Sequence, residues 1–440
     1  MGKSNRVSRR VFLVSTAAAV AGCATGRRPR IRRVSPLEKL NVAGIGVGGM
    51  GKHDIGACAS ENVVALCDVD EKQAAESFKR FPKARRYRDF RVMLEKEKDI
   101  DAVTVSTPDH VHFIAAMTAM ELGKHVYVQK PLAHSICEAR TLAKAASTYK
   151  VATQMGNQGH SGDGVRRLCE MVWAGAIGPV REVHAWTNRP VWPQGIPEPL
   201  PAQPVPDTLD WNLWLGPAPE RPYNPGYAPF AWRGWWDFGC GGLGDMGCHI
   251  LDPANYALKL GPPSSVEVLH QVGNNDQTGP TSCTVRYEFP QRDDMPPVTL
   301  YWYEGQDKPP RPEGIPEDER LGEGDNGSYF VGDDGVITTG CYGGGTRLVP
   351  AKRMRDYTMP EPTIPRRSEH HQDWLEACKG IGPACSNFDY AGPFTETVLL
   401  GNLALRTGKR IEWDAEKMKA KSVPEAAQYV RRKYRRGWRA

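Results

Sequence analysis

The sequence lacks the features of several common protein classes. None of its 11 cysteines forms a Cys-x-x-Cys pair, which excludes a zinc ribbon and a thioredoxin-like motif. The longest hydrophobic run near the amino terminus has about a dozen residues, fewer than the ~20 that a membrane-spanning helix needs. Residues 34–416 hold 39 Lys and Arg against 50 Asp and Glu, a net charge of −11. A nucleic-acid-binding protein needs a basic patch on its fold, so we expect no nucleic acid partner.

Positive charge is concentrated at the two ends of the 440-residue chain. Residues 1–33 hold nine Lys and Arg and no acid, and residues 417–440 hold nine and a single acid. The first segment contains Arg9-Arg10, followed by an apolar run of small residues that leads to Cys23. This pattern is typical of a twin-arginine export signal that ends in a bacterial lipobox.

We therefore expect residues 1–37 to be a signal and a tether, with Cys23 lipidated and the protein exported to the periplasm. An ordinary cleaved signal peptide is the alternative. Contact with a membrane is expected only through the lipid anchor. The basic tail, residues 417–440, is interpreted as a solvated extension.

Residues 38–156 alternate strands and helices at the spacing of a doubly wound parallel sheet, which predicts a Rossmann domain. A strand over residues 40–45 runs into the pattern Gly44-x-Gly46-x-x-Gly49. In this interpretation Gly44 permits a tight turn, Gly46 lets the backbone approach a pyrophosphate, and Gly49 lets the next helix pack closely. The predicted cofactor contacts in this loop are Gly44, Gly46, Gly48, Gly49 and Met50.

An acid follows the second predicted strand, residues 63–67. Asp68 lies 24 residues after Gly44, close to the ~20 at which such domains place an acid that binds the ribose hydroxyls. A carboxylate at this position repels a 2′-phosphate, so the expected cofactor is NAD rather than NADP. Asp70 is a competing candidate, and a simple turn residue is the alternative interpretation of Asp68.

Further polar residues follow the later strands of this domain. Ligands of doubly wound sheets bind outside the carboxyl ends of the strands, so these residues are candidate contacts. The candidates for the cofactor are Thr107, Pro108, His110 and Lys130. Asn157 follows the next strand and is a candidate for the substrate.

Five motifs occur in order along the chain: Gly44–Gly49, Asp68, Ser106–His110, Gln129–Pro131 and Gly244–His249. Together they resemble the Gfo/Idh/MocA oxidoreductase family over residues 38–415, and within it the exported members with a twin-arginine signal. The chain departs from the family in one place, because it has Gln129-Lys130-Pro131 where the family usually has Glu-Lys-Pro.

The resemblance implies that residues 157–440 form a second α/β domain with a largely antiparallel open sheet, which binds substrate and serves oligomerisation. A helix near residues 393–407 is expected to return to the first domain. The resemblance further implies a homodimer or homotetramer, hydride transfer at a carbinol of a sugar or polyol, and a catalytic group of Lys130, Asp245 and His249.

These three side chains suit the oxidation of a carbinol, which releases a proton together with a hydride. His249 has an ordinary pKa near neutrality and is the expected base, while Lys130 polarises the oxygen or acts as base if burial lowers its pKa. Asp245 orients His249 or binds a neighbouring hydroxyl, since a spacing of four residues places both on one helix face. The alternatives are a solvated Lys130 and a helix-capping His249. No third metal ligand is evident, so no metal is expected.

Residues 189–239 are rich in proline and contain six tryptophans. Trp rings can stack on the C–H faces of a sugar, and the alternative is that they anchor an irregular insertion. The predicted substrate contacts are Asn157, His160, Arg233 and Trp235.

Three functions fit these features. The favoured one is an NAD-dependent oxidoreductase that transfers a hydride at a carbinol of a sugar, polyol or glycoside, and that holds its cofactor tightly because the periplasm supplies little free dinucleotide. The second is a redox-neutral glycoside hydrolase or lyase that oxidises a ring hydroxyl transiently and cleaves by elimination. The third is a non-catalytic dinucleotide-fold binding protein, which the intact Lys130, Asp245 and His249 disfavour.

Overall fold

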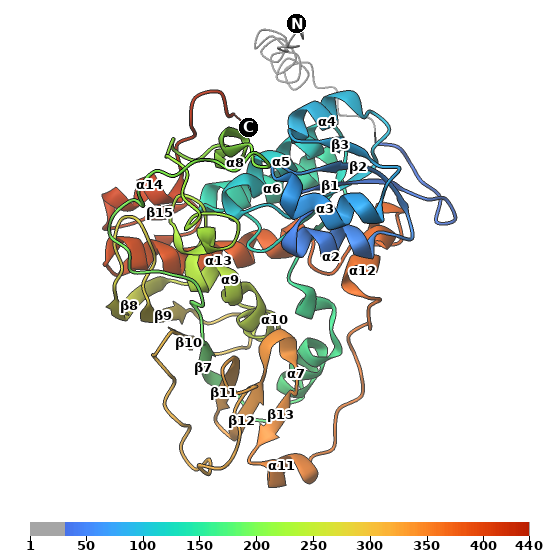
Figure 1. The fold of residues 1–440 in the computed structure, drawn as a ribbon. Helices are drawn as coiled ribbons and strands as arrows, with labels where there is room; N and C mark the ends of the chain where they lie inside the picture. The colour runs from blue at the N-terminus through green and yellow to red at the C-terminus, as the bar shows by residue number, and fades with distance from the viewer. Residues whose placement is uncertain (1–30, 440) are drawn as a thin grey trace, which may run out of the picture.

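The computed structural model of the protein describes residues 31–439 and contains two β-sheets (Figure 1). The predicted signal and the lipidation candidate Cys23 lie outside the described residues. No helix within the described part is long and apolar enough to cross a membrane. The ten cysteines from Cys58 onward are free thiols.

The first sheet has six parallel strands in the order β3-β2-β1-β4-β5-β6. Its strands are β1 (Asn41–Ile45), β2 (Asn62–Cys67), β3 (Arg85–Tyr87), β4 (Ala102–Val105), β5 (His125–Val128) and β6 (Thr153–Met155). The helices between them are α2 (Gly49–Ala57), α3 (Glu71–Arg80), α4 (Phe90–Lys96), α5 (Asp109–Glu121) and α6 (Ile136–Tyr149). All residues of β4 and β5 are buried, as expected of strands covered by helices on both faces. The strand order reverses between β1 and β4, which opens a crevice at their carboxyl ends.

The second sheet has nine strands in the order β13-β12-β11-β7-β10-β9-β8-β14-β15. They are β7 (Val180–Thr187), β8 (Ser265–Val272), β9 (Ser282–Phe289), β10 (Val298–Glu304), β11 (Gly327–Gly332), β12 (Gly335–Thr339), β13 (Arg347–Val349), β14 (Ile411–Asp414) and β15 (Lys419–Ala420). Only the β7–β10 pair is parallel among these described strands. The expected fold class, a Rossmann sheet followed by a largely antiparallel open sheet, is confirmed.

Helices connect the two sheets. The long helix α13 (Phe388–Thr407) packs against α6 of the first sheet, against α9 (Gly241–Ile250) and against β8. Arg140 on α6 donates from both Nε and Nη2 to the carboxylate of Glu396 on α13, the latter at 2.6 Å. Helix α12 (His370–Cys378) packs on α2 and β6. Figure 1 shows α13 running between the layers and α12 beside α2.

The remaining elements lie between the strands and helices already described or follow them. They are η1 (Gln158–Ser161), α7 (Asp163–Trp173), α8 (Trp211–Leu215), η2 (Ala231–Gly234), α10 (Asp252–Ala257), η3 (Cys341–Gly343), α11 (Ala351–Arg355), η4 (Pro424–Ala426) and α14 (Ala427–Val430).

The carboxyl-terminal segment is not a solvated extension, contrary to the prediction. Trp438 is only 7% exposed and packs against Phe90 with ring centroids 6.3 Å apart, while the Arg91 guanidinium lies 4.1 Å over its ring. Tyr434 Oη donates to Glu138 Oε1 at 2.6 Å. The prediction was based on the basic charge of this segment and did not consider its aromatic side chains. Tyr434 and Trp438 bury apolar surface against the first domain, and this burial stabilises the packed position of the tail.

Candidate active site

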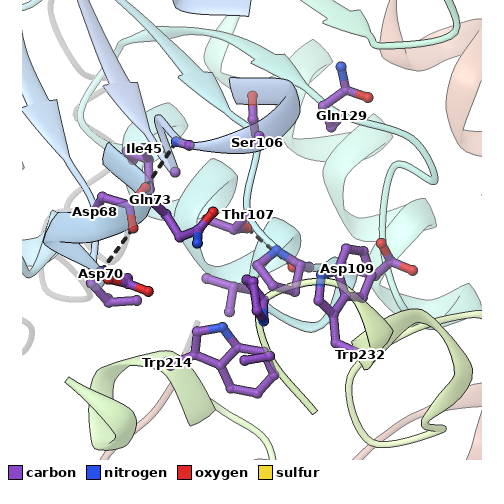
Figure 2. Close-up of a pocket in the computed structure, with 18 of the residues that line it drawn as sticks. Ile45, Asp68, Asp70, Gln73, Ser106, Thr107, Asp109, Gln129, Trp214 and Trp232 are labelled. Carbon is purple, nitrogen blue, oxygen red and sulfur yellow. Dashed lines mark hydrogen bonds between the residues drawn. The ribbon is translucent and has the colours of Figure 1, made fainter. Parts of the chain in front are cut away.

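A cleft of about 440 Å³ opens at the carboxyl ends of β1, β2, β4 and β5. Figure 2 shows Asp68 and Asp70 at one end, and Asp109 and Gln129 at the other. Of the predicted site residues, those that line it are Gly46, Gly48, Gly49, Met50, Asp68, Thr107, Pro108, Lys130, Arg233 and Asp245. This is the place at which doubly wound sheets bind ligands.

The glycine roles predicted from the sequence are wrong by two residues. Gly44 lies inside β1 and does not line the cleft. The turn falls at Gly46, which has φ +73° and whose added Cβ would lie 2.8 Å from the Ser106 carbonyl oxygen. Close packing falls at Gly51, where an added Cβ would lie 1.8 Å from the Gly46 oxygen. At Gly49 no atom lies within 4 Å of an added Cβ. The pattern that the fold uses is therefore Gly46-x-Gly48-x-x-Gly51, which the same stretch of sequence also contains.

Asp68 connects the end of β2 to this glycine loop. Its Oδ2 accepts from the Val47 amide at 2.8 Å and the Gly48 amide at 3.1 Å, and its Oδ1 accepts from the Asp70 amide at 3.0 Å. Burial raises the pKa of this carboxyl, and the three amides oppose that rise. Asp70 also lines the cleft and caps α3 through the Lys72 amide. Both acids considered from the sequence therefore lie at this end.

His110 is not a cleft residue, although it was predicted as a cofactor contact. Its ring is 1% exposed, with Nδ1 3.2 Å from the Phe238 oxygen and Nε2 3.0 Å from the Trp214 oxygen. Burial lowers its pKa to about 3. The imidazole joins α5 to the aromatic insertion, and both ring nitrogens are occupied in doing so.

Lys130 and Asp245 meet across the cleft. Lys130 Nζ donates to Asp245 Oδ1 at 2.9 Å and to the Asp245 main-chain oxygen at 2.6 Å. Arg189 Nε lies 3.2 Å from Oδ2, and Arg233 Nε lies 3.3 Å from Oδ1. Burial alone would raise the pKa of Asp245, but the charges of Lys130 and Arg233, followed by Arg189, hold it well below its usual range. The ionised carboxylate of Asp245 is thus in contact with three cationic side chains.

His249 lies one turn after Asp245 on α9, as the spacing predicts, but it does not line the cleft. Burial lowers its pKa well below the ordinary value, so the expected near-neutral pKa is not found. Its Nδ1 is buried without a hydrogen-bond partner among the described residues. The ring of Tyr342 meets it edge-on at 4.5 Å, from a backbone held at φ +60°, which is unusual for a tyrosine.

Three predicted substrate contacts do not line the cleft. Asn157 and His160 are 1% and 2% exposed, and both bind the carboxylate of Asp252, with His160 Nδ1 3.0 Å from each oxygen. The Tyr390 hydroxyl joins them at 2.7 Å. Trp235 is fully buried and donates to the Gly226 oxygen. The polar groups of these side chains are hydrogen-bonded inside the protein, so the prediction that they contact substrate at the cleft is corrected. Of the four predicted substrate contacts, Arg233 lines the cleft.

Gln129, which stands where the family usually has Glu, is hydrogen-bonded to a buried acid. Its Nε2 donates to both oxygens of the fully buried Asp54, at 3.1 and 3.0 Å. Ser106 Oγ at 2.6 Å and His371 Nε2 at 2.9 Å complete the surroundings of that carboxylate. A glutamate at position 129 would place a second carboxylate against Asp54, which like-charge repulsion disfavours in a buried site.

Part of the aromatic insertion forms the opposite wall of the cleft. We call residues 207–217 the strap. It runs antiparallel to the turn after β2, because the Glu71 amide donates to the Thr208 oxygen at 3.1 Å and the Asp210 amide to the Val69 oxygen at 2.9 Å. Leu209, Leu213 and Trp214 of the strap line the cleft; Figure 2 shows Trp214 facing the strand ends.

The sequence did not indicate two further parts of the cleft wall. Trp438 lines it from the docked tail, and nothing in the local sequence predicted this. Asp109 lines it at the start of α5, and its place after the strand-end Thr107-Pro108 was a usable signal. Its Oδ2 accepts from the Cys240 amide at 3.0 Å, and burial raises its pKa to about 7 against the charges of Arg233 and Lys130. Among the described residues, no group of three or more His, Cys, Asp or Glu is placed to hold a metal ion.

Asp109→Asn is expected to reduce the pH dependence of stability. Because the folded-state pKa of Asp109 is raised from 3.8 to about 7, the native state keeps a proton that the unfolded state releases. Wild-type stability from this group is therefore lost as pH rises from about 4 through about 7. Urea unfolding should show that the free energy of unfolding of the wild type falls relative to that of the variant by about 2.7 kcal/mol between about pH 5 and about pH 8. The exposed Asp318→Asn is the control; equal pH slopes for wild type and Asp109→Asn would contradict the expectation.

Comparison with known protein families and structures agrees with this geometry. The NAD-binding Rossmann fold of the oxidoreductase family matches residues 40–157, and the carboxyl-terminal α/β domain of that family matches residues 179–292. A levoglucosan dehydrogenase from Pseudarthrobacter phenanthrenivorans is 25% identical over 234 residues, which is 50% of this chain and 52% of that protein. An alpha-N-acetylgalactosaminidase from Shewanella oneidensis is 29% identical over 186 residues, 39% of this chain and 40% of that protein.

The chain thus spans about half the length of the levoglucosan dehydrogenase, and less of the second relative. Among solved structures, the WlbA dehydrogenase from Bordetella pertussis, in complex with NADH and UDP-GlcNAcA, superposes with a TM-score of 0.60 at 16% identity. That superposition covers 86% of this chain and 99% of WlbA, and it shows a shared fold. With both family domains matched in order and the same two-sheet architecture, the chain belongs to the Gfo/Idh/MocA oxidoreductase family.

Proposed function

We propose that the protein is an NAD-dependent oxidoreductase that transfers a hydride at a carbinol of a sugar, polyol or glycoside. The observation that carries this proposal is the Lys130–Asp245 pair, held at 2.9 Å in the same cleft as the glycine loop. Fold alone does not specify chemistry, whereas a cation and a carboxylate in this cleft supply groups that polarise a carbinol oxygen while a bound nicotinamide would take the hydride.

The residues of the cleft fit a dinucleotide. Gly46 and Gly48 line the cleft without side chains of their own, so the loop backbone is exposed there, and the amino terminus of α2 offers amide N–H groups for a pyrophosphate. Asp68 and Asp70 supply carboxylate oxygens for ribose hydroxyls and repel a 2′-phosphate, which favours NAD over NADP. Arg88 also lines the cleft, but its guanidinium is paired with Glu71 at 2.8 Å. When bound, the nicotinamide accepts a hydride from the carbinol carbon or returns it.

The roles of the side chains follow from their charges. Lys130 is held beside an ionised Asp245, so it can donate a hydrogen bond to the carbinol oxygen and polarise it. Asp245 orients that ammonium. Asp109 lines the cleft and can accept the proton, because its pKa of about 7 matches a neutral medium, whereas His249 is neutral but lies outside the cleft lining.

Lys130→Met is expected to lower kcat by about 10²–10⁴-fold while the amount of bound dinucleotide stays unchanged, because the glycine loop and the acids are untouched. The exposed Lys144→Met on α6 is the matched control. The test denatures purified protein, identifies the released dinucleotide, and follows reduced nicotinamide with sugars, polyols and aryl glycosides. Absence of any bound or bindable dinucleotide would refute the proposal. Comparing His249→Asn with Asp109→Asn assigns the proton acceptor.

Tight retention of the cofactor is part of the proposal, and the strap and the tail support it. Arg435 is 10% exposed and donates to the Gly216 oxygen at 3.1 Å, the Asn212 oxygen at 2.8 Å and Asn212 Oδ1 at 2.8 Å. Its own amide donates to the Pro217 oxygen at 3.0 Å. One arginine thus fastens the carboxyl-terminal tail to the strap, and both segments line the cleft.

Retention favours a second candidate function, the redox-neutral cleavage of glycosides, since a cofactor that returns its hydride in every cycle need not leave. Release of the aryl group from an aryl glycoside without net reduction would assign this function. Lasting reduction of the nicotinamide by a free sugar would assign the dehydrogenase.

Arg435→Ala is expected to release the dinucleotide about tenfold faster or more, because hydrogen bonds to a charged donor contribute about 1.5–3 kcal/mol each. The dissociation rate of the reduced dinucleotide is measured by its nicotinamide fluorescence after the complex is diluted into an excess of oxidised dinucleotide, which does not fluoresce. Arg436→Ala changes an exposed arginine on the same segment and serves as the control. An unchanged rate in Arg435→Ala would show that the tail does not retain the cofactor.

We also propose export to the periplasm with lipidation of Cys23, supported by the twin-arginine pattern in residues 1–37. A homodimer or homotetramer is the proposed assembly, supported by the alternation of buried and half-buried residues along β9 and β10, which leaves one face of the nine-stranded sheet partly uncovered.

A further inference from the structure

Three cations surround one carboxylate at the polar end of the cleft: Lys130 and Arg233 line the cleft together with Asp245, and Arg189 contacts Asp245 from beside it. Lys130, Arg189 and Arg233 all contact Asp245, within 2.9 to 3.3 Å, and their side chains are 15%, 26% and 24% exposed. This concentration is unusual in a chain whose residues 34–416 carry a net charge of −11. A single carboxylate compensates one of the three positive charges, so the cluster holds an excess of cations toward the cleft.

Two further acids lie near the cluster and offset this excess only in part. Asp109 lines the cleft, and Glu304 is buried on β10 behind Gly242. Burial raises the pKa of each to about 7, so both hold a proton for much of the time at neutral pH. The cluster therefore stays net positive near neutrality, and more so below it.

Each of the two arginines has N–H groups that are not hydrogen-bonded to the described part of the protein. Arg189 uses Nε for Asp245 and Nη1 for Asn188 Oδ1 at 2.6 Å, and Arg233 uses Nε for Asp245 and Nη1 for the Phe230 oxygen at 3.1 Å. Within residues 31–439, neither Nη2 donates to a protein acceptor. A guanidinium with free N–H groups is well suited to bind an oxyanion through two parallel hydrogen bonds.

The arginines are also held in place. The guanidinium of Arg233 lies 4.3 Å over the ring of Trp232 and 5.0 Å from that of Phe230, and it is anchored through Nε on Oδ1 of Asp245. Arg189 is anchored on the other oxygen, Oδ2. Both side chains are thus fixed before any ligand arrives, which lowers the entropy cost of binding one. Figure 2 shows Trp232 at the cleft, close to Asp109.

We propose that the substrate is an acidic sugar, whose oxyanion is bound by Arg189 and Arg233. This inference rests on the proposed function, because it names the substrate class of the same site. An oxyanion restores charge balance in the cluster and pairs the free guanidinium N–H groups, while Lys130 stays available for the carbinol oxygen. A carboxylate and a phosphate share this chemistry. Arg189 and Arg233 are then specificity-determining residues.

The test measures binding by calorimetry on the protein with its dinucleotide, so that it does not depend on turnover. Glucuronate, glucose and glucose 6-phosphate are compared. We expect an acidic sugar to bind more tightly than glucose, and Arg233→Met and Arg189→Met each to weaken that binding by about 10–100-fold. Glucose binding should weaken less than the binding of the acidic sugar in both variants. Arg181→Met, on the exposed end of β7, is the matched control.

The outcomes separate the inference from the function on which it rests. Preference for glucuronate assigns a carboxylate, and preference for glucose 6-phosphate assigns a phosphate; both support the inference. Glucose binding as tightly as the acidic sugars, or acidic sugars binding equally to wild type and the arginine variants, would overturn it. The oxidoreductase proposal would survive that result if a neutral sugar still reduced the bound dinucleotide. Absence of a dinucleotide would instead remove the proposed function.

Discussion

The ionised carboxylate of Asp245 is the constraint on which the site depends. A buried charge is unfavourable unless it is paired, and here the partners come from three separate parts of the chain: Lys130 after β5, Arg189 after β7 and Arg233 in η2. The Lys130 contact joins the first sheet to α9, so the same interaction that neutralises Asp245 also sets the position of the second domain against the cleft.

Apolar burial closes the rest of the cleft. The prolines of the insertion prevent regular structure, and its aromatic side chains compensate by packing on one another, as Trp211 and Trp214 do at 4.7 Å. Arg435 then fastens the tail to the strap through main-chain carbonyls that no helix or strand satisfies. The strap and the tail are thus joined to one another, and both contribute to the wall of the cleft.

The buried polar network around Asp252 shows why substrate contacts were harder to predict than cofactor contacts. Asn157 follows a strand of the first sheet, which is the right place for a ligand residue, yet its amide binds Asp252 in α10. His160 binds the same carboxylate from η1. Partners 92 and 95 residues away decide the role of each side chain. A local sequence pattern does not reveal pairings between residues so far apart in the chain. Polar residues at a domain junction therefore cannot be distinguished by sequence from polar residues in a binding site.

The sequence by itself determined the two-sheet architecture, the glycine loop, Asp68 at the end of β2, and the place of Lys130 and Asp245 in the cleft. The first sheet, the glycine loop, Asp68 and the strand-end position of Lys130 follow from local periodicity and short motifs, whereas the second sheet and the place of Asp245 were implied by the resemblance to the family. Only the tertiary structure decided which glycines form the turn and the close helix contact, since the close approach of Gly51 to Gly46 depends on how α2 packs. It likewise decided that His110 and Trp235 are buried, that Gln129 pairs with Asp54, and that Trp438 completes the cleft. Each of these depends on a contact between segments distant in the chain, where packing and charge pairing override composition.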